Sequence, residues 1–128
     1  MLKKAVFILL VLLLWSSLVY AQQLEVDEGV VTTGIVDRVP VDAVESYSAE
    51  VGRLYFFTRI VGADEETSVT HVWFFDDEEV ARVTLPVRSS NWRTWSSKNI
   101  LPEWVGTWRV EVVDAEGYVL KDVKFSLF

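Results

Sequence analysis

Residues 53–75 read RLYFFTRIVGADEETSVTHVWFF, two β-rich runs separated by a short polar segment. The first run, 53–61, is apolar on both of its faces, so we expect a strand at the centre of a sheet. The polar segment 62–67 has the composition of a turn. In the second run, 68–75, successive side chains point to opposite faces. One face then holds Val69, His71, Trp73 and Phe75, and the other holds Thr70, Val72 and Phe74.

Similar runs recur at intervals of about 10 to 15 residues, with turn residues between them. They cover residues 30–38, 80–87, 92–100, 107–113 and 118–127. The segment 40–52 is irregular, and we expect one helical turn around 42–47. Pro86 lacks a backbone donor, which predicts a sheet edge for the run 80–87. Seven short strands in about 100 residues predict an all-β fold, an immunoglobulin-like antiparallel β-sandwich of about seven strands.

The N-terminus has the features of an export signal. Lys3 and Lys4 precede an apolar run, and residues 19–21 place small side chains where a signal peptidase inspects the chain. We expect a signal peptide over residues 1–21, cleaved between Ala21 and Gln22, and a single periplasmic or secreted domain over 22–128. The alternative is an uncleaved anchor, but the apolar run 5–20 is shorter than the ~20 residues that span a bilayer.

The exported domain is acidic. Removal of Lys3 and Lys4 leaves ten basic residues against 19 acidic ones, a formal charge of −9. Such a domain repels phosphate backbones, so nucleic acid is not expected as a partner. Membrane contact is expected only through an uncleaved N-terminal segment. The chain has no cysteine, so its stability must come from packing, to which many aromatic side chains contribute.

Three motifs together resemble a known family. They are HVWFF at 71–75, WRTWSSK at 92–98 and GTWRVEVVDAEGYVL at 106–120. The combination resembles the bacterial domain of unknown function family 2914, whose pattern has a His-x-Trp strand, an Arg-Thr-aromatic-Ser-Ser-Lys strand, and a Gly-x-Trp strand followed by an Asp-x-x-Gly turn. The matching positions are His71, Trp73, Arg93, Thr94, Ser96, Ser97, Lys98, Gly106, Trp108, Asp114 and Gly117. The resemblance implies a small exported or membrane-attached β-sandwich module and supplies no catalytic residues.

The stretch NWRTWSSKNILPEW at 91–104 holds three tryptophans and two cations. As a strand it places Trp92 and Lys98 on one face, and Arg93 and Trp95 on the other. In one interpretation, one indole fills the core, the other lies across a neighbouring strand, and a cation stacks on an indole. In the other, the strip is an exposed aromatic platform for sugar rings or peptide backbones.

Catalysis by this strip is the competing interpretation. Ser96 or Ser97 with Lys98 or His71 would make a small hydrolase. No nucleophile elbow or Ser-x-x-Lys helical motif supports it, and a mid-strand lysine usually extends its ammonium group to water. His71 is the only histidine, and we expect it to be half-buried and bonded to backbone or to a strand neighbour.

No metal or other cofactor is expected. With one histidine and no cysteine, a zinc site would need carboxylates for its other ligands. The acidic segments 64–66 and 76–79 lie at opposite ends of one predicted strand, so they cannot form one calcium site. If the strands alternate in direction, the segment 64–66 shares its end of the domain with 88–91 and 114–116.

The sequence therefore predicts a non-catalytic binding or assembly module of the bacterial cell envelope. The expected partner is a protein or an envelope glycan. The candidate contact surface lies on the predicted strands 68–75, 92–100 and 107–113. Its candidate residues are His71, Trp73, Arg93, Trp95, Ser96, Ser97, Lys98 and Trp108.

Overall fold

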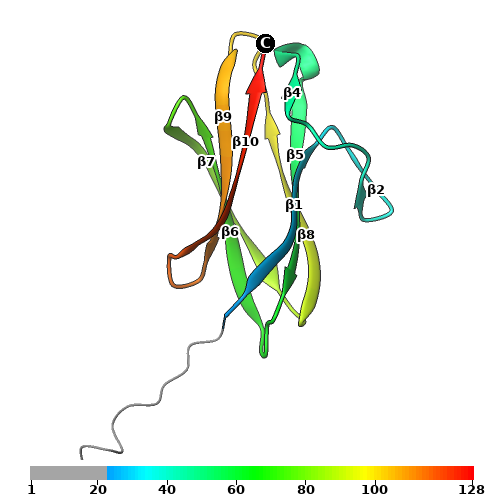
Figure 1. Cartoon of the computed structure of the whole chain (residues 1–128), viewed down its shortest axis with the longest axis vertical. Helices are drawn as coiled ribbons and strands as arrows, with labels where there is room; N and C mark the ends of the chain where they lie inside the picture. Colours follow the sequence, from blue (N-terminus) through cyan, green and yellow to red (C-terminus); the bar gives the residue numbers. More distant parts are fainter. Residues whose placement is uncertain (1–22) are drawn as a thin grey trace, which may run out of the picture.

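A computed structural model describes residues 23–128. The expected signal peptide 1–21 and its cleavage site at Ala21 and Gln22 lie outside the described residues. No helix within 23–128 has the length and apolar character needed to cross a membrane. The domain is built from seven long strands, three strands of two residues and one 3-10 turn (Figure 1). They are β1 (Glu25–Thr32), β2 (Ile35–Val36), β3 (Val39–Pro40), β4 (Ser46–Tyr47), η1 (Ala49–Val51), β5 (Arg53–Val61), β6 (Thr67–Phe75), β7 (Glu78–Val87), β8 (Asn91–Asn99), β9 (Gly106–Asp114) and β10 (Val119–Leu127).

The seven long strands confirm the predicted all-β class, and differences are confined to the N-terminal third. The predicted strand 30–38 is split, because Asp37 and Arg38 both have positive φ and form the tight turn between β2 and β3. The helical turn expected at 42–47 is wrong. Residues Ser46–Tyr47 form β4, and a 3-10 turn follows at Ala49–Val51. The side chain of Ser48 caps this turn by accepting a hydrogen bond from the backbone nitrogen of Glu50.

The long strands form two sheets. One has three strands in the order β1-β5-β8, and the other has five in the order β4-β10-β9-β6-β7. In Figure 1 the two sheets stand beside each other along the long axis of the domain. All pairs of long strands are antiparallel. The short strand β4, however, pairs in parallel with β10. The prediction of a purely antiparallel domain is therefore wrong at this one pair.

The position of β5 confirms the expectation drawn from its composition. It lies between β1 and β8, the centre of the three-stranded sheet. Its residues Leu54, Phe56 and Ile60 point into the core between the sheets. Phe57 points the opposite way, yet it is also buried, because the indole of Trp95 stacks against it on the outer surface. A strand that is apolar on both faces is thus covered on both faces.

The edges of the two sheets follow from the same order. In the three-stranded sheet β1 and β8 are the outer strands, and in the five-stranded sheet β4 and β7 are. Pro86 lies in β7, so the prediction of an edge strand there is confirmed. The chain passes directly from β7 to β8, and these two edges therefore lie on the same side of the sandwich.

Gly62, in the turn after β5, is a position where the fold requires glycine. Its φ is +93°, and a Cβ atom there would lie 2.8 Å from the backbone oxygen of Gln23. We predict that Gly62→Ala lowers the free energy of unfolding by about 1–3 kcal/mol, from backbone strain and from this clash. The matched control is Gly52→Ala, where φ is +81° but nothing lies within 4 Å of the added atom. Equal losses in urea denaturation of the two variants would contradict the clash.

Candidate functional site

The structure divides the candidate residues into a buried group and a surface group. His71, Trp73, Ser96 and Trp108 are buried in the core. Arg93, Trp95, Ser97 and Lys98 are half-buried or exposed. The expected common surface does not form, since β6 and β9 belong to one sheet and β8 to the other. The expectation of a half-buried His71 is also wrong, because its side chain is fully buried between the sheets.

Three of the buried residues, His71, Trp73 and Ser96, take part in a hydrogen-bonded bridge between the two sheets. His71 Nδ1 lies 2.7 Å from Ser96 Oγ, and His71 Nε2 lies 3.1 Å from Thr58 Oγ1. Trp73 Nε1 donates to the same Ser96 Oγ at 3.1 Å. Thr58 Oγ1 donates to the backbone oxygen of Thr94 at 3.0 Å. His71 and Trp73 come from β6, whereas the other three come from β5 and β8, so every contact of His71 here crosses the core.

The two ends of this bridge determine where its protons lie. An indole nitrogen only donates, and a carbonyl oxygen only accepts. Because the hydroxyl of Thr58 donates to Thr94, it accepts from His71 Nε2–H. In the neutral ring His71 Nδ1 is then the acceptor, and the hydroxyl of Ser96 donates to it while accepting from Trp73. A neutral imidazole with its proton on Nε2 gives each polar group in the bridge a partner.

Burial lowers the pKa of His71 to about 3, because the interior of the domain does not solvate an imidazolium. The ring also packs against Phe56 in an edge-to-face contact, with 4.7 Å between the ring centroids. A second proton would in addition turn Nδ1 into a donor, and the hydroxyl of Ser96 would lose its acceptor. The structure thus holds His71 neutral.

The contact between Ser96 and His71 resembles a nucleophile and base pair, but its environment does not. Both residues are buried, and neither lines the cavity beside β8 or the cavities of about 400 and 40 Å³ elsewhere in the described residues. The second nitrogen of His71 bonds a threonine hydroxyl rather than a carboxylate. Lys98 Nζ bonds the backbone oxygen of Asn99 and lies over the ring of Trp104. The hydroxyl of Ser96 is thus committed to a structural contact.

The first interpretation of the stretch 91–104 describes the observed packing. Trp92 packs against the core, and Trp95 lies across the neighbouring strand β5 on the ring of Phe57. The expected stacked cation is Lys98, whose Nζ lies 4.7 Å from the ring centroid of Trp104. Trp92 and Trp95 are each only half-buried, so part of each indole remains at the surface.

These exposed parts line a cavity of about 260 Å³ beside β8. Four consecutive residues of β8 contribute to it, together with two residues from the end of β7 and the turn that follows. The lining residues are Pro86, Arg88, Trp92, Arg93, Thr94 and Trp95. Consecutive residues of a strand alternate between its two faces. A cavity lined by four in succession therefore runs along the free edge of β8 rather than over one face of the sheet.

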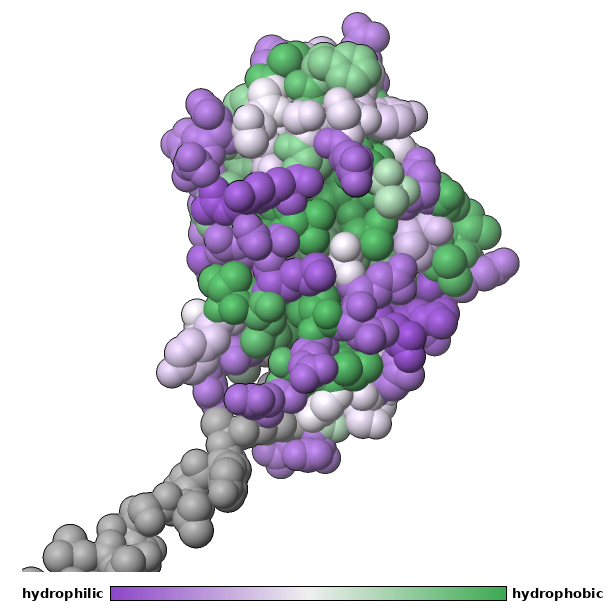
Figure 2. Space-filling model, viewed as in Figure 1, coloured by the Kyte–Doolittle hydropathy of each residue, from purple (hydrophilic) through white to green (hydrophobic). Residues whose placement is uncertain are grey.

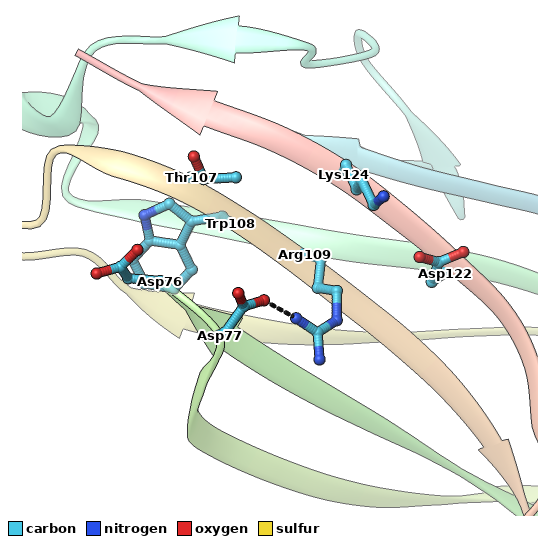
Figure 3. A pocket seen from close by; sticks show the side chains of 7 residues that line it. All are labelled: Asp76, Asp77, Thr107, Trp108, Arg109, Asp122 and Lys124. Carbon is cyan, nitrogen blue, oxygen red and sulfur yellow. Dashed lines mark hydrogen bonds and ion pairs between the residues drawn. The ribbon is translucent and has the colours of Figure 1, made fainter.

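A larger cavity, of about 400 Å³, lies on the outer face of the five-stranded sheet (Figure 3). Its lining mixes both charges: Asp76, Asp77, Thr107, Trp108, Arg109, Asp122 and Lys124. Arg109 is already neutralised there by ion pairs with Asp77 and Glu111, and its guanidinium lies over the ring of Phe74. This cavity is thus lined by charges of both signs, whereas the charged residues that line the cavity beside β8 are both cationic.

Exposed apolar side chains gather mainly away from both cavities. Figure 2 shows apolar areas separated by hydrophilic residues on the face seen there. The largest exposures include Val36, Val39 and Val41, around the β2–β3 hairpin on the right of Figure 1, together with Tyr118 and Phe128.

The acidic segments occupy the places expected for them. Glu66 lies 3.7 Å from Arg88, and the segments 64–66 and 88–91 share one end of the domain as predicted. Asp76 and Asp77 form the tight turn between β6 and β7, both with positive φ. No group of three metal-ligating side chains occurs within residues 23–128.

The candidate list omitted Thr58 of the bridge and, in the cavity beside β8, Pro86, Arg88, Trp92 and Thr94. Thr58 belongs to the bridge, and the signal was its position: it shares the inward face of β5 with Leu54, Phe56 and Ile60, where a hydroxyl needs a partner. Arg88 belongs to the cavity beside β8. It lies in a turn, and no sequence pattern connects a turn residue to an edge.

A family model described as "Protein of unknown function (DUF2914)" matches residues 66–127, which confirms the resemblance drawn from the motifs. The match covers β6 to β10 and so includes His71, Trp73 and Ser96 of the bridge. No match is found among curated proteins. Because the family description assigns no activity, any function must be argued from the site.

We predict that Ser96→Ala lowers the free energy of unfolding by about 1–3 kcal/mol, because it leaves His71 Nδ1 and Trp73 Nε1 without partners in the core. The matched control is Ser97→Ala, one residue away on the exposed outer face, with an expected change within about 0.5 kcal/mol. Urea denaturation of both variants measures the difference. Similar small changes in the two would contradict the bridge.

The buried imidazole also predicts a pH dependence of stability. The pKa of His71 is lowered on folding, so the unfolded chain binds its proton first, and stability falls as pH decreases from 6.5 towards 3. Between pH 7 and pH 5 the expected loss is about 2 kcal/mol in the free energy of unfolding, for an untagged chain with one histidine. His71→Gln should be less stable at pH 7 but should lose this dependence. Nitrogen-15 NMR of His71 gives an independent check: an imidazolium signal at pH 5 in the folded chain would refute the assignment.

Proposed function

We propose that this chain, whose residues 66–127 match the DUF2914 family model, is a non-catalytic binding or assembly module exported to the periplasm or secreted. Its partner is a protein or a glycan of the bacterial cell envelope. The site is the cavity beside β8, with two indoles and two guanidinium groups in its lining. That cavity is the single observation that carries the proposal.

The proposed architecture is immunoglobulin-like. What supports it is the strand order: the first, second and fifth long strands share one sheet, and the other four long strands share the second. Strands distant in sequence are therefore neighbours, as in sandwiches of this type. The short parallel pairing of β4 with β10 adds the N-terminal segment to the second sheet.

The chemistry of the cavity suits recognition. Half-buried indoles offer apolar faces that stack on sugar rings or on apolar side chains. Arg88 and Arg93 offer several hydrogen-bond donors each, in a geometry that matches carboxylates. Trp and Arg are also the residue types that contribute most to binding energy at protein interfaces.

The non-catalytic part of the proposal rests on the bridge. The groups needed for hydrolysis, the Ser96 hydroxyl and the His71 imidazole, hold the two sheets together and are closed to solvent. Ser97 is exposed, but the ammonium group of its neighbour Lys98 lies over the ring of Trp104 and donates to the backbone oxygen of Asn99. A hydrolase would need at least one of these groups free to reach a substrate.

Export is proposed from the N-terminal segment 1–21 and from composition. A chain without cysteine whose sheets are joined by hydrogen bonds needs no disulfide in an oxidising compartment. Its acidic charge favours solubility there.

The experiment is retention of envelope components on the immobilised chain. We predict that Trp95→Ala weakens retention about tenfold or more, because it removes one of the two indoles that line the cavity. The matched control is Trp104→Ala, which removes another half-buried indole outside the cavity and should leave retention unchanged. Treating the extract with protease or with periodate shows whether the retained partner is a protein or a glycan, because each treatment destroys only one of them. Equal retention by both variants would contradict a site beside β8.

A further inference from the structure

Three of the four edges of the two large sheets carry features that discourage pairing with another strand. β1 has a register shift between Val26 and Glu28 and an acidic side-chain row. β7 has a register shift opposite Trp73 and Phe74, and contains Pro86. β4 is only two residues long. Bulges, charges, proline and shortness are the usual means by which proteins protect exposed edges.

The fourth edge, β8, has none of these features except cationic side chains. All nine of its residues, 91–99, pair with β5 in one uninterrupted register. It contains no proline, no glycine and no acidic residue. On its other side it pairs with no strand of the described part of the chain. A long edge without bulge or proline is a template for strand addition.

The ladder determines which backbone groups of β8 face outward. Beyond its two ends, Gly62 donates to the oxygen of Ser90, and Ile100 donates to the oxygen of Gly52. Because hydrogen-bonded pairs alternate in antiparallel strands, the even-numbered residues of β8 bond to β5 and the odd-numbered ones face the open edge. The oxygens of Asn91 and Asn99 accept from the side chains of Ser89 and Lys98. The backbone groups of residues 93, 95 and 97 remain for a partner.

The cavity and the charge lie beside these same residues. Four consecutive residues, 92–95, line the cavity along the edge. On the outer face, Arg93 stands directly opposite Arg59 of β5, a pairing of like charges. Arg59 is compensated by Asp27 and bonds Asn91, whereas Arg93 has no hydrogen bond or ion pair within residues 23–128. An incoming carboxylate would compensate it.

We propose that β8 binds an extended acidic segment of a partner protein by strand addition. The inference rests on the proposed function and names the partner class for the same site. The added strand bonds to the backbone of residues 93, 95 and 97. Its outward side chains place a carboxylate on Arg93, and an apolar side chain on its other face enters the cavity between Trp92 and Pro86.

Charge decides between this occupant and a second copy of β8. A second copy brings the sequence NWRTWSSKN, which has two cations and no carboxylate, so Arg93 would stay uncompensated. A glycan could compensate Arg93 but cannot complete the backbone ladder of a strand.

The probe is a ten-residue peptide that alternates valine and glutamate, titrated into the full-length protein purified from expressing cells. Its counterpart alternates valine and lysine and should bind at least tenfold more weakly. Two further peptides are N-methylated on all valines or on all glutamates. The backbone N–H groups of the valines and those of the glutamates point to opposite sides of the peptide strand, so only one set can bond to β8. One methylated peptide should therefore lose binding, and the other should retain it. Equal behaviour of the two methylated peptides would overturn strand addition.

Two protein variants test the same contacts. Arg93→Glu should weaken binding of the glutamate peptide about tenfold or more and strengthen that of the lysine peptide, while it removes the repulsion from Arg59 and so retains the fold. Ser97→Pro removes an outward N–H and should abolish binding, whereas Ser97→Ala should not. Glutamate-peptide binding that is indifferent to Arg93→Glu would overturn the charge assignment.

The envelope extract separates this inference from the proposed function. Retention of a protein that is lost in Arg93→Glu supports both. Retention of a glycan, or of a protein indifferent to Arg93→Glu and Ser97→Pro, overturns the inference and keeps the proposed function. Retention of nothing, with no peptide bound, overturns both. Concentration-dependent self-association that Ser97→Pro abolishes assigns the edge to a second copy and overturns the acidic partner.

Discussion

The domain depends on a polar bridge at the centre of an otherwise apolar core. In two packed sheets without a disulfide, the alignment of one sheet on the other depends on the contacts between them. Here hydrogen bonds join five groups across the interface, from the indole of Trp73 to the carbonyl of Thr94. The direction of each hydrogen bond follows from an indole that only donates and a carbonyl that only accepts. The apolar contacts supply most of the stabilisation, and the bridge makes one alignment better than its neighbours. The histidine motif that first suggested chemistry therefore has a structural role.

Much of the fold was predictable because period-two patterns and turn residues are local signals. The strand 53–61 was predicted with its observed bounds, and its apolar faces indicated its central place. The N-terminal third was not predictable, because β2, β3 and β4 are each two residues long. The turn at Asp37 determines the pairing of β2 with β3, and the hydrogen bonds to β10 determine β4. Propensity carries almost no information over two residues, and tertiary contacts decide instead.

The candidate site was predictable only in part, for a related reason. The sequence placed Trp92 and Trp95 on opposite faces, but only the order of strands decides which face meets the core and which edge stays open. It marked His71 as unusual without indicating that its partners, Thr58 and Ser96, come from the other sheet. Cross-sheet contacts of this kind join residues 13 and 25 positions apart, beyond the reach of any motif. As a result, alternating residues of β8 have two roles. Ser96 bonds His71 in the core, whereas Arg93 lines the surface cavity.

The directional bridge has a consequence for how relatives of this chain diverge. Loss of any one side chain leaves its neighbours with unsatisfied polar atoms, whereas replacing several together by apolar groups of similar shape is nearly neutral. Single steps are therefore disfavoured in evolution and concerted ones are tolerated. Relatives of this chain should therefore either keep the histidine, the serine and the tryptophan of the bridge together, or replace all three by apolar residues.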